Sequence, residues 1–237
     1  YAKSGTITLE NVKVNSGSVN SEEYAGGLVG KAYKTNSYFK NCINNATVQA
    51  KYGPTGGSHA MVAAGILANT QEAKTTIFDN CINNGTINLT QNKEARSVVG
   101  GGIFGYSYFS DNTSIAFISC ESNGQINFQG NEGTEYSGTI LGGWGIAKNP
   151  YLFIYMKDCK SNNVLCSCDA ISKYDVTEAR ALLTIKNGDT SKVYYMGTSG
   201  ITNPTKADKS DTWAEVTNCT ATVNYNWENK TITVEYN

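Results

Sequence analysis

The sequence predicts an all-β protein wound into a parallel, right-handed β-helix of about four to five coils, with a capping region at its C-terminal end. Two observations carry this prediction. A motif centred on a cysteine occurs four times, and successive cysteines lie 39 residues apart. A glycine-rich motif precedes every copy, in the same order each time. Tandem repeats indicate stacked units that share one core, and 24 glycines with 16% charged residues suit a turn-rich fold.

The cysteine motif describes two short strands joined by a bend. Three residues before each cysteine lies a large apolar side chain, and the positions six and eight residues after it are mostly apolar as well. Positions two apart share one face of a strand. An asparagine three residues after each cysteine, followed by alanine, glycine or asparagine, favours the bend. Stacking of like positions then predicts ladders formed by Cys42, Cys81, Cys120 and Cys159 and by Asn45, Asn84, Asn123 and Asn162.

The glycine motif reads Gly-Gly-Leu-Val-Gly at residues 26–30 and returns with changes at 64–68, 101–105 and 138–142. The spacing between the two motifs varies, as expected if insertions lie at the corners of coils. A β-propeller is the alternative architecture, because its repeats have a similar length and kelch blades carry a glycine pair. The aromatic pair of kelch repeats and the Trp-Asp pair of WD40 repeats do not recur here. The right hand follows from the preference of parallel crossovers.

The C-terminal third departs from the repeat. We assign residues 1–169 to the β-helix, and residues 170–237 to an insertion, a degenerate last coil and a capping hairpin of the same domain. A short helix is expected at residues 175–183. Strands at residues 220–225 and 231–236 are expected to form the hairpin. Atypical terminal units of this kind cover the open edges and the core of a solenoid.

The pairing of Gly-Gly-Leu-Val-Gly at residues 26–30 with Asn-Cys-Ile-Asn-Asn at 41–45, repeated in tandem, resembles the GLUG-motif repeats of bacterial surface proteins, especially those of gut Bacteroidetes. The similarity extends over residues 12–166, with an echo at 216–223. The fourth copy departs from the pattern, because its second glycine is replaced by Thr139. The resemblance implies a secreted or cell-surface protein, such as a lipoprotein or an adhesin, and it defines no ligand.

Charge and hydropathy exclude several partners. The 19 basic and 20 acidic residues give a net charge of −1 with no long run of either sign, which argues against nucleic acid as a partner. No apolar stretch is long enough to form a transmembrane helix. The N-terminal residues are not a signal peptide, and the start at Tyr1 suggests that a targeting segment has been removed. We expect an extracellular or cell-surface location, and the oligomeric state is left open.

The reactive side chains predict neither metal nor cofactor binding. The cysteine column is expected to be a row of buried free thiols, because stacking in register seldom gives disulfide geometry. Cys166 and Cys168 are too close in sequence for an easy mutual bridge, and any pairing of Cys219 is left open. A metal site needs converging His or Cys ligands. The one histidine, His59, is expected to lie in a solvated loop.

Aromatic residues between the two motifs are the candidate ligand-binding side chains. Exposed aromatic rings on a solenoid stack on sugars or anchor a protein partner. The alternative is that these rings pack against the corners of the coils. Residues from adjacent coils are expected to form one patch, made of Tyr106, Tyr108, Trp144 and Tyr151.

These features predict a non-catalytic cell-surface module that binds a glycan, or a host or matrix protein. No catalytic residue is assigned, because glycoside hydrolysis needs two positioned carboxylates. The two arginines, Arg96 and Arg180, lie in no obvious acidic cluster. Two alternatives stay open. One is a carbohydrate-active β-helix enzyme, of the polysaccharide lyase or glycoside hydrolase type, whose acidic groups converge only in space, and the other is a structural spacer.

Overall fold

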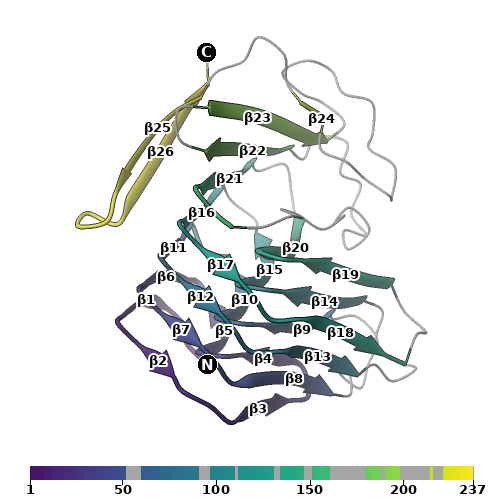
Figure 1. The fold of residues 1–237 in the computed structure, drawn as a ribbon. Helices are drawn as coiled ribbons and strands as arrows, with labels where there is room; N and C mark the ends of the chain where they lie inside the picture. The colour runs from purple at the N-terminus through teal and green to yellow at the C-terminus, as the bar shows by residue number, and fades with distance from the viewer. Residues whose placement is uncertain are drawn as a thin grey trace.

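Parallel strands stacked coil upon coil make up most of the molecule (Figure 1). The structure is a computed structural model that describes residues 1–51, 60–90, 97–109, 112–130, 134–146, 151–160, 180–187, 190–197, 214–215 and 221–236. Within these ranges the chain forms strands and turns, and no helix of membrane-spanning length and apolarity is found there. The predicted parallel β-helix is confirmed. A propeller is excluded, because the strands of each sheet come from successive repeats and run parallel.

Each coil passes through five sheets, which we number I to V in chain order. Sheet I begins with one strand from each coil and gains further strands at its C-terminal end. Its strands are β1 (Gly5–Glu10), β6 (Thr35–Lys40), β11 (Thr75–Asp79), β16 (Thr113–Ile118), β21 (Tyr151–Lys157), β22 (Arg180–Asn187), β23 (Thr190–Gly197) and β24 (Ala214–Glu215). Sheet II contains the short strands β2 (Lys13–Val14), β7 (Ile43–Asn44), β12 (Ile82–Asn83) and β17 (Glu121–Ser122).

The other three sheets hold four strands each. Sheet III contains β3 (Ser18–Ser21), β8 (Thr47–Lys51), β13 (Ile87–Thr90) and β18 (Ile126–Gln129). Sheet IV contains β4 (Tyr24–Gly26), β9 (Ala60–Ala64), β14 (Ser97–Gly101) and β19 (Thr134–Gly138). Sheet V contains β5 (Val29–Tyr33), β10 (Leu67–Gln71), β15 (Phe104–Phe109) and β20 (Leu141–Ile146). The first coil is therefore β1–β5, the second β6–β10, the third β11–β15 and the fourth β16–β20.

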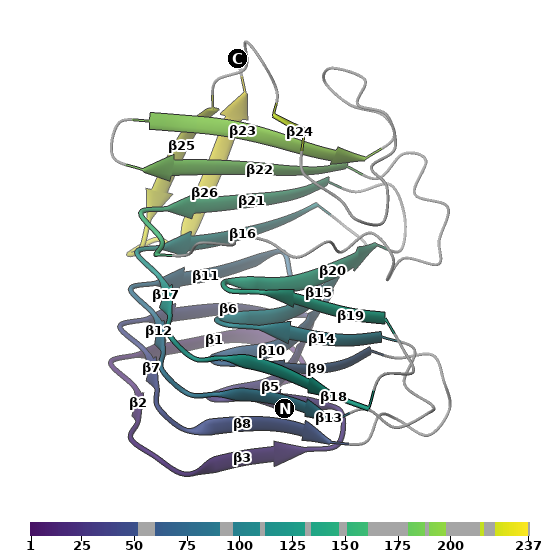
Figure 2. The same ribbon diagram turned by 45° about the vertical axis from the view of Figure 1, so that its right-hand side comes forward.

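Sheets IV and V are folded inward between sheets III and I, which gives each coil four layers (Figure 2). Met61 and Ala63 of β9 pack with the inner side chains of sheet III. The intervening Val62 faces the other way and belongs to the main core with sheets V and I. Both faces of β9 and β14 are thus buried, as their apolar sequences require.

Like residues lie over like in the core. Phe39, Phe78 and Phe117 are register partners in sheet I. Their rings stack with centroids 5.1 Å apart in both pairs and interplanar angles of 7° and 4°. Parallel strands fix a spacing of about 4.8 Å between neighbours, so a column of identical aromatic residues must stack face to face. Met156 of β21 is the register partner of Phe117 and continues the column.

The number of residues between register partners differs between sheets and is smaller for the first coil. In sheet I, Phe39, Phe78 and Phe117 follow each other by 39 residues, whereas Leu9 pairs with Phe39 at a separation of 30. In sheet V, Leu67 and Phe104 are separated by 37 residues. From the second coil to the fourth, the connection from sheet III to sheet IV shortens from eight to six to four residues, while the connection from sheet V to sheet I lengthens from three to four. The corners thereby absorb the insertions, and the registers of sheets I to III stay unchanged.

The glycine motif and the cysteine motif recur together because they pack against each other. The glycine motif turns the chain from sheet IV into sheet V, and the tip of this turn meets the corner formed by sheet II. A Cβ atom on Gly65 would clash with the side chain of Asn83 and with the carbonyl oxygen of Gly102 in the next coil. Gly27 stands in the same relation to Asn44 and Gly65. Only glycine permits this approach.

The buried asparagines satisfy the polar backbone at this corner. The Asn44 side chain accepts a hydrogen bond from Ala46 N at 3.1 Å and donates to Ala46 O at 2.9 Å. It also donates to Oδ1 of Asn83 in the next coil at 2.9 Å. Asn83 repeats the local pattern with Gly85. Both asparagines have no exposed surface, so every one of these bonds forms away from water, where an unmade bond is costly.

A further bend, with a residue in the left-handed region, lies one residue before each cysteine of the column. Asn41, Asn80, Ser119 and Asp158 all have φ near +50°, and Asn tolerates this region best among residues with a Cβ atom. The predicted bend between the two short strands is also present, since Ala46, Gly85 and Gly124 form bends directly after Asn45, Asn84 and Asn123. These three asparagines do not themselves have positive φ. Their predicted stacking is nevertheless found, as described below. Asn162 lies outside the described residues.

The C-terminal region differs from the prediction in two respects. Residues 180–183, placed in a helix by the sequence pattern, begin strand β22, which pairs parallel with β21 and antiparallel with β23. Pairing with an available sheet edge here overrides local helix propensity. The predicted hairpin is present as β25 (Ala221–Asn226) and β26 (Thr231–Tyr236). It was expected to cap the end of the solenoid, and it packs instead on the outer face of sheet I.

Neighbouring asparagines give a matched test of this core. We expect Asn83→Ala to lower the free energy of unfolding by about 3 kcal/mol, because it strands the buried backbone groups of Gly85 and the amide of Asn44. We expect Asn84→Ala, at an exposed position, to change it by no more than about 0.5 kcal/mol. Urea unfolding of the two variants measures the difference. Equal losses would contradict the assignment of Asn83 as the inward residue.

A second test addresses the glycine turn. We expect Gly65→Ala to destabilise the protein strongly, because the added methyl group meets both the Asn83 side chain and the Gly102 backbone. Adding Asn83→Ala should not restore stability, since the backbone clash persists. Thermal unfolding of the single and double variants decides the matter. Recovery in the double variant would show that the backbone can move aside.

Candidate functional site

The four aromatic residues predicted to bind a ligand do not form one exposed patch. Tyr106 is only 7% exposed and belongs to the main core, so it is a core residue. Tyr108 is half-buried against the same core. Trp144 is the register partner of Ser107 in sheet V. The side chains of Trp144 and Tyr151 lie outside the described residues, and their binding role stays a prediction.

The cysteine column is a row of free thiols at the corner between sheets I and II. Cys42, Cys81 and Cys120 have no exposed surface and Cys159 is partly buried. From Cys81 on, each thiol lies within hydrogen-bonding distance of the carbonyl oxygen three residues before the preceding cysteine, as in the 3.4 Å contact from Cys120 Sγ to Phe78 O, and Cys42 Sγ lies 3.4 Å from the equivalent Leu9 O. Burial raises the pKa of the Cys120 thiol. This row is therefore structural, as predicted. Cys166, Cys168, Cys219 and His59 lie outside the described residues.

A continuous polar surface covers sheets II and III, and we call it the polar face. Side chains alternate between core and solvent through this part of every coil. The outward positions of the second, third and fourth coils are partly or fully exposed, and only two of their eighteen residues are charged. They are Asn41, Ile43, Asn45, Thr47, Gln49 and Lys51; Asn80, Ile82, Asn84, Thr86, Asn88 and Thr90; and Ser119, Glu121, Asn123, Gln125, Asn127 and Gln129.

Amide side chains on the polar face are joined from coil to coil. Asn84 Nδ2 donates to Asn45 Oδ1 at 2.8 Å, and Asn123 Nδ2 donates to Asn84 Oδ1 at 2.9 Å. These bonds confirm the asparagine ladder for the three copies that the structure describes. A second row runs through Asn127, which donates to Asn88 at 3.0 Å.

A third row of amides runs through the left-handed corner. Asn80 donates to Asn41 at 2.8 Å, and Asn41 donates to Asn11 at 3.0 Å. In all three rows the amide N–H group donates to the asparagine of the preceding coil. The buried Asn44, by contrast, donates to Asn83 of the following coil. These hydrogen bonds restrain the rotamers of the asparagines that form the rows. The polar face is therefore ordered before any partner arrives, which lowers the entropy cost of binding.

The chemistry of the polar face is that of uncharged donors and acceptors. A primary amide carries two N–H donors and two lone pairs, and a hydroxyl adds one donor and two acceptors. The charged groups lie at the margins, where Lys160 Nζ is 2.9 Å from Glu121 Oε2. Among the described residues no group of three or more His, Cys, Asp or Glu side chains is arranged to hold a metal ion. The arrangement suits hydrogen bonding to a neutral polar partner.

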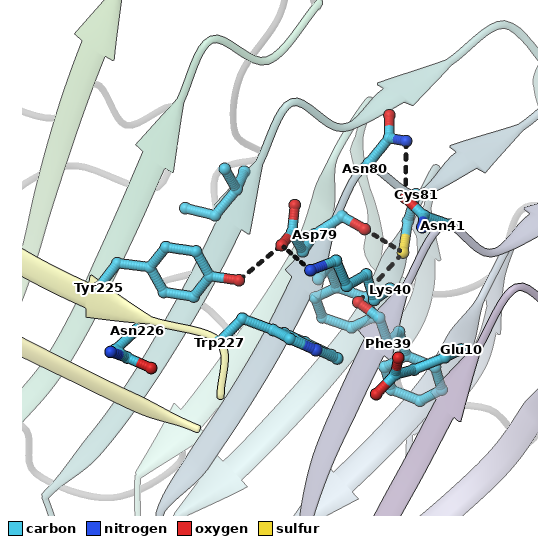
Figure 3. A network of polar contacts seen from close by, with 12 residues as sticks. Glu10, Phe39, Lys40, Asn41, Asp79, Asn80, Cys81, Tyr225, Asn226 and Trp227 are labelled. Carbon is cyan, nitrogen blue, oxygen red and sulfur yellow. Dashed lines mark hydrogen bonds and ion pairs between the residues drawn. The ribbon is translucent and has the colours of Figure 1, made fainter. Parts of the chain in front are cut away.

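The C-terminal hairpin packs on the outer face of sheet I, next to the corner that carries Asn41 and Asn80 (Figure 3). One column of sheet I presents apolar side chains outward, and Val223, Tyr225, Trp227 and Ile232 pack against it. The column consists of the register partners Tyr38, Ile77, Ala116 and Tyr155. Trp227 keeps only 7% of its surface exposed. The hairpin thus buries a face that would otherwise be an exposed apolar stripe.

Charged residues surround the edge of this hairpin contact. The Tyr225 hydroxyl donates to Asp79 Oδ2 at 2.7 Å, and Lys40 Nζ lies 3.8 Å from the same oxygen. Lys230 Nζ lies 3.6 Å from the centroid of the Trp227 ring, close enough for a cation–π contact. Burial, together with the hydrogen bond to Asp79, raises the pKa of Tyr225. Lys40 Nζ also lies 5.1 Å from the centroid of the Trp227 ring, and Lys230 Nζ lies 3.8 Å from Glu10 Oε1, so the hairpin contacts the first three coils.

The amide rows outside the predicted ladder were missed, although the repeat alignment contains a signal for them. Asparagine or glutamine stands seven residues after the cysteine in three copies, as Gln49, Asn88 and Asn127. Outward columns of a solenoid are free to vary, so a retained amide there indicates more than a solvated surface. The hairpin contacts had no comparable signal, because nothing in a local pattern says which distant face a strand covers.

We expect the Tyr225 contact to make stability depend on alkaline pH. Because the folded-state pKa of Tyr225 is raised, the unfolded chain loses this proton first as the pH passes about 10. The stability that Tyr225 contributes is therefore present at neutral pH and is lost at higher pH. Tyr225→Phe should cost about 1 kcal/mol near pH 7, and its deficit relative to the parent should shrink above pH 10. Urea unfolding at both pH values tests this; a constant deficit would contradict it.

Comparison of the chain with protein-family models, with curated proteins and with solved structures found no match, so the assignment of a function depends on the geometry above.

Proposed function

We propose that this chain is a non-catalytic binding module of a bacterial cell surface, and that its polar face contacts a glycan or a host or matrix protein. The observation that carries the proposal is the set of in-register, hydrogen-bonded amide rows along the outside of sheets II and III. Solvation alone does not require such order. A rigid array of uncharged donors and acceptors is what adhesion to a neutral polar surface requires.

The distribution of carboxylates favours binding over catalysis. A glycosidase needs two carboxyl groups facing one bond. The carboxylates of Glu10, Glu72, Asp79 and Glu121 each lie within 4 Å of a lysine ammonium group, at separations of 3.8, 3.4, 3.8 and 2.9 Å. These four belong to ion pairs at the surface. The alternatives of a carbohydrate-active enzyme and of a plain spacer are separated from the proposal by the experiment below.

The resemblance of the paired motifs to GLUG repeats supports the cell-surface location. It also agrees with the structure in one respect, since the two motifs pack against each other at Gly65 and Asn83. A module of this kind needs a stiff shape that presents one surface repeatedly. The stacked coils supply this stiffness through continuous hydrogen bonding between strands.

The test compares two sets of asparagine substitutions. We expect Asn84→Ala combined with Asn88→Ala to weaken binding to arrayed polysaccharides or mucin by about tenfold, the effect of roughly 1.4 kcal/mol. The matched control is Asn224→Ala, an exposed asparagine on the hairpin. Circular dichroism confirms that both variants are folded. Equal binding by all proteins would remove the polar face as the site, and turnover of a polysaccharide by the purified chain would favour the enzyme instead.

A further inference from the structure

We infer that the polar face takes a linear, uncharged polysaccharide lying along the solenoid axis, with successive sugars meeting successive coils. This inference rests on the proposed function and names the ligand class for the same surface. It follows from the direction of the amide rows, from the spacing of their amides and from the hydrogen-bond donors and acceptors that each amide has left.

The rows run across the strands, so their repeat is the spacing between neighbouring strands. Gln49, Asn88 and Asn127 are register partners in β8, β13 and β18, and Asn20 extends the row into β3. Neighbouring strands are about 4.8 Å apart. A partner that lies along the row therefore meets an amide group every 4.8 Å or so, over four coils.

The amides inside a row have bonding capacity left for a partner. Asn84 uses one N–H group to donate to Asn45 and one lone pair to accept from Asn123. An amide has two of each, so a second donor and a second acceptor remain. A partner must then offer both donors and acceptors at every step. The hydroxyl group of a sugar does so, since it donates and accepts at one atom.

The spacing distinguishes a glycan from an extended peptide. Side chains on one face of a peptide strand repeat about every 6.6–6.8 Å, which falls out of step with the rows within two coils. Each ring of an extended, equatorially linked polysaccharide advances the chain by roughly one strand spacing. Because neighbouring rings of such a chain are turned over relative to each other, every coil meets one ring and the identical contact returns on every second coil.

Charge distinguishes a neutral glycan from an anionic one. The outward positions of the second, third and fourth coils carry one lysine, Lys51, and one glutamate, Glu121. Glu121 is already paired with Lys160. Polyanions are bound through arrays of Lys and Arg side chains, and the polar face has no such array among the described residues. A neutral polymer does not need one.

Each contact between a sugar and an amide is weak by itself. The dependence of affinity on oligosaccharide length is therefore the most informative measurement. We expect affinity for linear β-1,4-linked gluco- or manno-oligosaccharides, measured by calorimetry, to rise about fivefold for each added sugar, the worth of roughly one net hydrogen bond. The rise should stop once the oligosaccharide spans the four coils. Asn88→Ala, in the middle of the row, should remove the gain from longer chains, and Asn127→Ala, at its end, should bring the plateau about one sugar earlier.

The remaining outcomes would overturn either the inference or the proposed function. Affinity that does not depend on length overturns the axial arrangement. Preferential binding of polygalacturonate or of an extended peptide, still lost in Asn88→Ala, overturns the neutral glycan and leaves the proposed function standing. If no ligand responds to Asn84→Ala or Asn88→Ala, while the Asn224→Ala control behaves as the parent, both the inference and the proposed function fall.

Discussion

The parallel register between coils is the constraint on which the rest of this structure depends. Backbone hydrogen bonds hold neighbouring strands at one spacing, and every side chain then lies over its counterpart in the next coil. Phenylalanine stacks on phenylalanine, and asparagine donates to asparagine. At the inner corner this leaves so little room that glycine alone fits opposite Asn44 and Asn83. A substitution in one coil therefore alters the packing against the coils on both sides of it.

The two outer faces of the solenoid solve opposite problems. Sheet I turns an apolar column outward, and the C-terminal hairpin covers it with Trp227 and Tyr225. Sheets II and III turn amides and hydroxyls outward, and these satisfy one another along the rows. The first face contributes to stability, because apolar area is removed from water. The second is left for contact with a partner, because its donors and acceptors are only half used.

The same hydrogen bonds serve the fold and the proposed binding. A surface asparagine row adds little to stability when each member is exposed, as expected for Asn84. Its effect is to fix rotamers, so a ligand meets groups already placed. This separation means that the binding surface can be altered without unfolding the solenoid. The buried row at Asn44 and Asn83 does not have this freedom, since it holds backbone groups that have no access to water.

The repeat in the sequence by itself determined the β-helix, the cysteine row and the asparagine ladder, because stacked coils translate sequence period directly into spatial neighbours. It also indicated the hairpin strands, whose pairing is local. Only the tertiary structure decided that Tyr106 enters the core and that residues 180–183 join a sheet edge. Each of these depends on how sheets IV and V fold inward, or on which edge is open. Such relations join segments far apart in the chain, and no periodic pattern encodes them.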